Sequence, residues 1–162
     1  MLPQARGSCL SVGSTTRRDG MADAIDIVRK SIDAWNAHDA NGVAELVSND
    51  YLFESDTVPA PLRGPEGVRQ LVEMYVRAFP DIRVEIVETL VSGDQVTTRW
   101  RATGVHGGDL MGIPATHKHV VTNGCNISEV RNGKVVRESS YWDTGNLLRQ
   151  IGVLPAPSVA SH

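Results

Sequence analysis

Apolar residues in the first half of the chain recur at helical spacing. The clearest series is Ile25, Val28, Ile32 and Trp35. Steps of three or four residues place these side chains on one face of an amphipathic helix, so we predict a first helix over residues 23–39. A second, short helix is expected around residues 43–47. A third opens at Pro65, a residue favoured in the first helical turn, and ends before residues 79–81.

The second half of the chain has the alternation and the turn signals of β-strands. Strands are predicted over residues 82–91, 95–103, 119–130 and 134–143, after an earlier strand that begins at Tyr51. Residues 104–118 form a glycine-rich loop, and residues 147–154 close the domain. This order predicts an α+β domain, with helices packed on one face of a curved antiparallel sheet.

The two ends of the chain differ from its centre in composition. Residues 1–20 are rich in Gly, Ser, Thr and Arg, lack periodicity and precede a second methionine, Met21. We expect a disordered leader over residues 1–20, one domain over residues 21–155 and a flexible tail over residues 156–162. A chain of 162 residues, 41% of them apolar, has enough material for one hydrophobic core.

Charge and cysteine content exclude several classes of protein. The net charge is −3, and because residues 1–20 contribute +2, the rest of the chain sums to −5. An acidic domain argues against a nucleic-acid partner. No apolar run approaches the roughly 20 residues of a membrane span and no secretory signal opens the chain, so we expect a cytoplasmic protein with no membrane partner. Two cysteines, Cys9 and Cys125, suggest neither a disulfide framework nor a metal site.

Several local motifs stand out in order along the chain. They are AWNAHD at residues 34–39, AFPD at 78–81, GVH at 104–106, MGIPAT at 111–116, NGK at 132–134, YWD at 141–143 and LLRQIG at 147–152. In this order they resemble the SnoaL-like polyketide cyclase (ester cyclase) family of the nuclear transport factor 2-like superfamily, over residues 24–154. Two departures from the family pattern, Val105 and His117, lie in the loop over the expected pocket and bear on the identity of the substrate.

The resemblance implies a fold and a chemistry. Members of this family form a cone-shaped roll, in which the sheet wraps around an apolar cavity and the N-terminal helices pack on its concave face. They use no metal and no organic cofactor. In the polyketide cyclases a carboxylate on the last strand removes a proton beside a carbonyl, and the enolate closes a ring by intramolecular aldol addition. By resemblance Asp143 holds that position, the ligand is a small hydrophobic or polycyclic molecule, and the protein is a homodimer or higher homo-oligomer.

The turn at residues 131–133 allows two registers for the last hairpin. A three-residue loop sets Asp143 opposite Val121, on a mostly apolar face that also holds His119, Asn123 and Tyr141. A two-residue Asn-Gly turn instead places Asp143 on a polar face. We favour the first register because it segregates apolar residues better. Burial would then raise the pKa of Asp143 and make it a stronger base when ionised. The competing role for Asp143 is the N-cap of a helix that starts at Thr144.

Other side chains complete the predicted site. The candidate donors to an enolate oxygen are His106, His119, Asn123 and the indole of Trp35. His106 either reaches over the pocket or bonds to loop backbone. The side chains expected to shape the cavity and bind substrate are Trp35, Tyr51, Phe53, Tyr75, Trp100, Asn123 and Tyr141. His117 and His119 form an H-x-H pair, but no third ligand lies nearby, so we predict no metal site.

These features predict a cofactor-independent cyclase or isomerase of a carbonyl-rich, polyketide-like molecule, with Asp143 as general base and His106 and His119 polarising the carbonyl. Two alternatives remain open. One is an epoxide hydrolase or dehydratase on the same fold; the epoxide hydrolases of this fold combine an Asp with an Arg, which here would need Arg99 or Arg101 to enter the pocket beside Asp143. The other is a protein that binds small molecules without catalysis.

Overall fold

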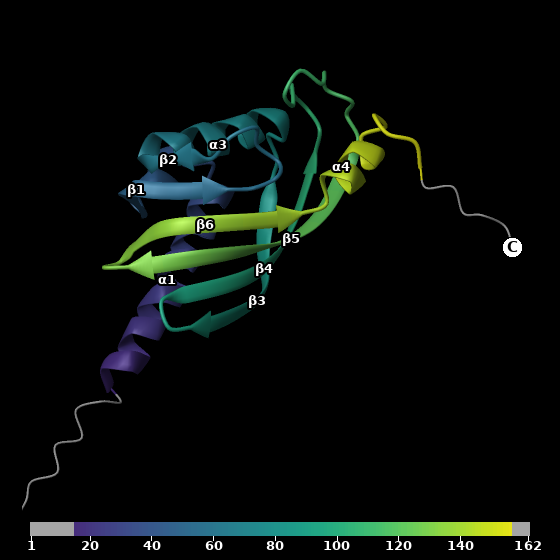
Figure 1. Ribbon diagram of the computed structural model, residues 1–162. Helices are drawn as coiled ribbons and strands as arrows, with labels where there is room; N and C mark the ends of the chain where they lie inside the picture. Colours follow the sequence, from purple (N-terminus) through teal and green to yellow (C-terminus); the bar gives the residue numbers. More distant parts are fainter. Residues whose placement is uncertain (1–14, 157–162) are drawn as a thin grey trace, which may run out of the picture.

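A computed structural model describes residues 15–156 of the chain (Figure 1). Its elements are α1 (Thr15–Asn36), α2 (Ala40–Glu45), β1 (Val47–Glu54), β2 (Leu62–Arg63), α3 (Gly64–Ala78), β3 (Arg83–Ser92), β4 (Gln95–Val105), β5 (His119–Arg131), β6 (Lys134–Trp142) and α4 (Thr144–Gln150). Helix α1 begins at Thr15, so residues 15–20 are helical and do not belong to a disordered leader. The rest of that leader, residues 1–14, and most of the predicted tail, residues 157–162, lie outside the described residues.

The strands form one curved sheet in the order β2-β1-β6-β5-β4-β3. The predicted meander of four strands, β3 to β6, is confirmed, and so is the α+β class. The sheet is mixed, however, because β1 pairs with β6 in the parallel direction. The short strand β2, which pairs antiparallel with β1, is an additional strand that the sequence analysis did not predict.

The helices cover the concave side of the sheet (Figure 1). Helix α1 packs against β3 and β4, α3 packs against β1, and α2 contacts both of the longer helices. Asp39 begins α2 by accepting a hydrogen bond from the Gly42 amide at 2.8 Å. The main core lies between these helices and the sheet, with Val28, Val43, Tyr51, Val72 and Val96 among its buried side chains. The sequence prediction of Tyr51 as a ligand contact is therefore wrong, since its side chain is packed in this core.

The last hairpin turns on two residues. Asn132 and Gly133 have φ of 50° and 71°, both left-handed, and Arg131 pairs with Lys134. This is the two-residue turn that the sequence analysis placed second, so the predicted three-residue loop is wrong. A register shift follows at once, between Glu129 and Val130, and from there on Cys125 pairs with Tyr141. Because of this shift, Asn123 and Tyr141 lie on the same face of the hairpin, as the three-residue loop predicted.

That group of side chains nevertheless lies on the outer face of the sheet. Tyr141 is 57% exposed, Ile127 is 38% exposed, and Asn123 is also exposed. Thr122 and Ser128, on the opposite face of β5, are buried. The prediction that the apolar face lines the pocket is therefore wrong. The inner face carries polar side chains at its centre. These can be buried because they form hydrogen bonds with one another.

One close approach shapes this inner face. The indole of Trp100, on β4, lies directly over Gly124 of β5, and a Cβ atom on Gly124 would fall 2.2 Å from the Trp100 ring. The Trp100 Nε1–H donates to Asn126 Oδ1 at 2.8 Å, which fixes the ring over the glycine. Only glycine leaves room for this placement.

We expect Gly124→Ala to destabilise the fold by about 1–3 kcal/mol, because the added methyl group must displace the Trp100 ring. In an ordinary strand the same change is neutral or favourable. Urea unfolding gives the free energy. Asn123→Ala, on the outer side of the same strand, is the control and should stay within about 0.5 kcal/mol of wild type. Equal stability of Gly124→Ala and wild type would show that Trp100 does not pack on this glycine.

Candidate active site

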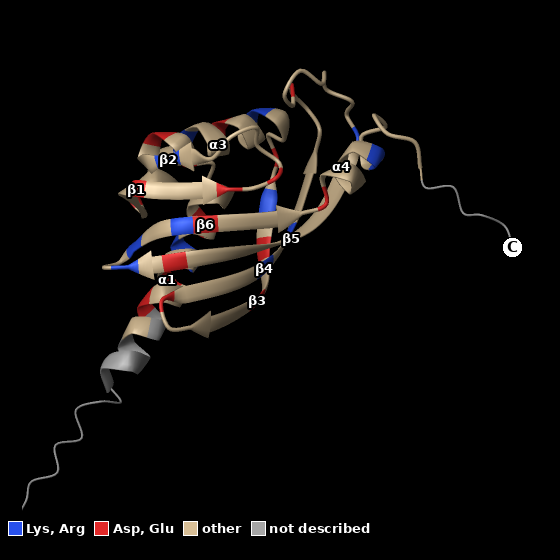
Figure 2. Ribbon diagram, viewed as in Figure 1, with Lys and Arg blue, Asp and Glu red and all other residues tan. Residues whose placement is uncertain are grey.

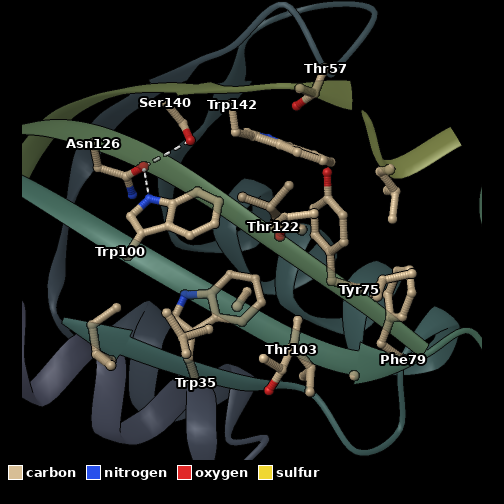
Figure 3. Close-up of a pocket in the computed structure, with 18 of the residues that line it drawn as sticks. Trp35, Thr57, Tyr75, Phe79, Trp100, Thr103, Thr122, Asn126, Ser140 and Trp142 are labelled. Carbon is tan, nitrogen blue, oxygen red and sulfur yellow. Dashed lines mark hydrogen bonds between the residues drawn. The ribbon is translucent and has the colours of Figure 1, made fainter. Parts of the chain in front are cut away.

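A cavity of about 130 Å³ lies between the inner face of the sheet and helices α1 and α3 (Figure 3). Its volume is below the roughly 300–1,000 Å³ of a pocket that encloses a drug-sized ligand. The cavity is open on one side, so a polycyclic ligand would extend through this opening. Most of the side chains around it are apolar, as is usual for sites that bind small organic molecules.

Aromatic side chains dominate the wall. All three tryptophans of the chain, both phenylalanines and one tyrosine line the cavity: Trp35, Trp100, Trp142, Phe53, Phe79 and Tyr75. The rings contact one another, with Tyr75 6.4 Å from Trp35 and 6.2 Å from Trp142 between centroids. The structure thus places four of the predicted cavity residues, Trp35, Phe53, Tyr75 and Trp100, in the wall. Such a wall suits a flat, unsaturated ligand.

A polar network occupies the middle of the inner face. Glu138 of β6 accepts hydrogen bonds from Asn126 Nδ2 at 2.9 Å and from Ser128 Oγ at 3.0 Å. Asn126 Oδ1 in turn accepts from Trp100 Nε1 and from Ser140 Oγ, each at 2.8 Å. Figure 3 shows the hydrogen bonds that Trp100 and Ser140 make to Asn126. Four side chains from three strands therefore hold one carboxyl group at the cavity wall.

Glu138 is the one carboxyl group among the described residues that line the cavity. Burial raises the pKa of Glu138 from 4.5 to about 6, although the hydrogen bonds from Ser128 and Asn126 lower it in part. The group is thus half-ionised near pH 6 and ionised at pH 7. A carboxylate of raised pKa in an apolar cavity is the usual arrangement of a general base.

Asp143 is not part of this wall. Its carboxylate is 65% exposed, accepts a hydrogen bond from the Asn146 amide at 2.8 Å and lies 3.5 Å from the Arg149 guanidinium. It caps the N-terminus of α4. The prediction that Asp143 faces inward is therefore wrong, and the competing N-cap interpretation is the correct one. The physical reason is that the face of the hairpin predicted to carry Asp143 is the outer one, and that β6 ends at Trp142, which leaves Asp143 free to cap α4.

His106 is completely buried but does not line the cavity. Its ring packs on Phe79 at 5.4 Å, and Nδ1 accepts a hydrogen bond from the Thr116 amide at 3.3 Å. The His106 amide donates to the Lys118 carbonyl, and the His106 carbonyl accepts from the His117 amide. These backbone hydrogen bonds join the two ends of the loop over residues 107–117. This is the second of the two roles that the sequence left open, a histidine bonded to loop backbone.

The remaining predicted residues lie outside the cavity. His119 and Asn123 are exposed on the outer side of β5, and Tyr141 is exposed on β6, where it pairs with Cys125. Arg99 is also on this side and pairs with Glu88 at 3.5 Å, while Arg101 is exposed. Neither arginine enters the pocket. The arrangement of Asp143 with Arg99 or Arg101 inside the pocket, on which the epoxide hydrolase alternative depended, is therefore not formed.

The cavity residues that sequence reasoning missed include Glu138, Asn126, Ser140 and Trp142. A signal for them was present. The rejected two-residue turn already placed Thr122, Gly124 and Asn126 together on one polar face. Along β6, one face carries Glu138, Ser140 and Trp142 and the other carries Arg137, Ser139 and Tyr141. An acidic residue on the buried face of a strand is costly unless it is paired or functional.

Charged groups elsewhere are mostly on the surface. Basic residues gather around the β5–β6 turn (Figure 2), where a second groove lies on the outer side of β1 and β6. Two of its three arginines are paired, Arg137 with Glu54 and Arg131 with Glu129. Within residues 15–156, no three His, Cys, Asp or Glu side chains gather in a way that could hold a metal ion. No helix in this part of the chain is long and apolar enough to cross a membrane.

Comparisons with known proteins agree with this architecture. The family model of the SnoaL-like polyketide cyclases matches residues 25–151. The aklanonic acid methyl ester cyclase DnrD of Streptomyces peucetius is 29% identical over 134 residues, which cover 82% of this chain and 92% of DnrD.

Solved structures place the fold in the same group. AclR of Streptomyces galilaeus superposes with a TM-score of 0.76 at 27% identity, covering 86% of this chain and 87% of AclR. A nuclear transport factor 2-like protein of Burkholderia pseudomallei superposes with a TM-score of 0.69 at 17% identity, covering 82% of this chain and 99% of that protein, which shows a shared fold. Since the family model spans most of the sequence, this chain belongs to the SnoaL-like polyketide cyclase family.

Proposed function

We propose that this protein is a cofactor-independent cyclase of a carbonyl-rich, polyketide-like molecule, and that Glu138 is its general base. The observation that carries the proposal is a carboxyl group of raised pKa in the wall of an aromatic cavity. Membership of a cyclase family and likeness to aklanonic acid methyl ester cyclases support the substrate class.

The proposed reaction needs only acid–base chemistry. The Glu138 carboxylate removes a proton from a carbon flanked by carbonyl groups, and the electron pair of that C–H bond forms an enolate. The enolate carbon attacks a second carbonyl of the same molecule, which forms the new C–C bond and an alkoxide. The proton held by Glu138 returns to the alkoxide, so the product has the same mass as the substrate.

The network around Glu138 suits this role. Asn126 donates to one oxygen of the Glu138 carboxylate and Ser128 donates to the other. Each oxygen keeps another lone pair that can accept the substrate proton. Because Asn126 is itself fixed by Trp100 and Ser140, the base is held in one orientation before substrate arrives. Such preorganisation lowers the barrier because little has to move during proton transfer.

We expect Glu138→Gln to lower turnover by about 10²–10⁴-fold, the usual loss when a general base is removed. The assay is the conversion of aklanonic acid methyl ester to an isomer of equal mass, followed by liquid chromatography and mass spectrometry. Wild-type activity should fall below pH 6 as Glu138 becomes protonated.

Asp143→Asn is the matched control, since it removes the carboxylate of the predicted base but keeps a good N-cap residue for α4. We expect this variant to keep turnover close to wild type. If Asp143→Asn lost activity while Glu138→Gln retained it, Glu138 would be excluded as the base.

The pKa of Glu138 also gives an expectation for stability. Because its pKa is raised in the folded state, the native protein holds this proton more tightly than the unfolded chain does. The contribution of protonated Glu138 is complete below about pH 4.5 and is lost as the pH rises through 6. We expect wild type to lose about 2 kcal/mol relative to Glu138→Gln between pH 4 and pH 7.5. Urea unfolding of both proteins across this range checks it, and parallel curves would contradict a buried Glu138.

We also infer a homodimer or higher oligomer through the outer face of the sheet. Leu90, Ile127 and Tyr141 are exposed there, and no described element covers them. Light scattering after gel filtration should give a mass of at least twice the 17.5 kDa of one chain. Ile127→Glu should lower it to that of a monomer by placing charge in the interface. A wild-type protein that is already monomeric would exclude this interface.

A further inference from the structure

The hydroxyl group of Tyr75 is buried and has no hydrogen-bond partner among the described residues. Most buried polar groups in proteins are paired, so an unpaired one needs a reason. Burial raises the pKa of the Tyr75 phenol above its usual value; the Thr57 hydroxyl lies near enough to lower it slightly, but its geometry is not that of a hydrogen bond. The group therefore stays protonated at neutral pH and remains a hydrogen-bond donor without an acceptor.

The surroundings of this hydroxyl belong to the cavity. Tyr75 projects from α3 between Trp35 and Trp142, and Thr57 lies near its oxygen (Figure 3). All four side chains line the cavity wall. The donor therefore lies where a ligand seated against the aromatic rings would meet it.

Tyr75 and Glu138 mark two separate points of this cavity. Tyr75 contacts Trp142, which lies four residues beyond Glu138 on β6, so about 13 Å separates the Cα atoms of Glu138 and Trp142. Between them the inner face presents Ser140 and the Trp100 ring. A ligand that reaches both points lies along β6 and across Trp100, which requires an elongated molecule and favours a flat one.

We propose that the Tyr75 hydroxyl donates a hydrogen bond to a carbonyl oxygen of the ligand, so that the cavity selects fused-ring ketones over hydrocarbons of the same shape. This inference rests on the proposed function for its ligand class, but it concerns binding and needs no turnover. In a reaction that forms an enolate, a donor at this position would stabilise charge on the oxygen.

The test compares 1-tetralone with tetralin, two fused-ring probes that differ in one carbonyl oxygen. Affinities are measured by nuclear magnetic resonance titration of wild type and of Tyr75→Phe, which removes only the hydroxyl. We expect wild type to prefer 1-tetralone. Tyr75→Phe should lose about tenfold in affinity for 1-tetralone, because a hydrogen bond to a buried, otherwise unpaired donor is lost. Its affinity for tetralin should stay within about twofold.

A second readout reports the hydrogen bond itself. The ¹³C resonance of a labelled 1-tetralone carbonyl should move downfield on binding to wild type, and this shift should be absent with Tyr75→Phe. Tyr141→Phe, which removes a hydroxyl from the outer side of the sheet and away from the cavity, is the matched control and should bind both probes as wild type does. The melting temperature of Tyr75→Phe should be no lower than that of wild type, since the change removes an unpaired polar group.

The proposal is overturned if Tyr75→Phe weakens both probes equally, or weakens neither. It is also overturned if wild type binds tetralin as tightly as 1-tetralone or binds neither probe. Glu138→Gln separates this inference from the proposed function, because it should keep the preference for 1-tetralone while losing turnover. Loss of the preference with Tyr75→Phe would therefore support the donor even if Glu138 proved not to be the base.

Discussion

The amide of Asn126 holds the inner face of the sheet together. Its oxygen accepts from Trp100 and Ser140, and its nitrogen donates to Glu138, so one side chain joins β4, β5 and β6 through hydrogen bonds. Without these bonds a carboxyl group on this face would be a buried, unpaired polar group, which is costly. The network thus makes a polar centre compatible with an aromatic cavity.

Backbone geometry decides which side chains take part. The two-residue turn at Asn132 and Gly133 sets the register of the last hairpin, and the irregularity near Glu129 shifts that register by one residue. Beyond this point Glu138, Ser140 and Trp142 face the helices, while Arg137, Ser139 and Tyr141 face outward. A slip of one residue would exchange the two sets, so the chemistry of the cavity depends on this local feature.

The sequence was sufficient for the order of elements, the meander and most of the aromatic wall, since helical spacing and strand alternation are local signals. It failed where the outcome depended on long-range pairing. The parallel contact of β1 with β6 joins residues far apart in the chain and leaves no local pattern. The site was misplaced because Asp143 and Glu138 lie on opposite faces of the last hairpin, and no local signal tells which of these faces packs against the helices. The sequence analysis took the more apolar face of the hairpin as the inner one, and this is the face that points outward.

The position of β6 within the sheet has a consequence for synthesis on the ribosome. Although β6 is made after the other five described strands, it lies in the interior of the sheet, between β1 and β5 (Figure 1). Strand β1 therefore has only the two-residue β2 as a neighbour until residues 134–142 have emerged. Sequence-distant pairings of this kind form slowly, because a long loop must close first. The nascent chain thus carries an incomplete, exposed sheet edge from the synthesis of β1 until that of β6, and Glu138 joins the inner face only then.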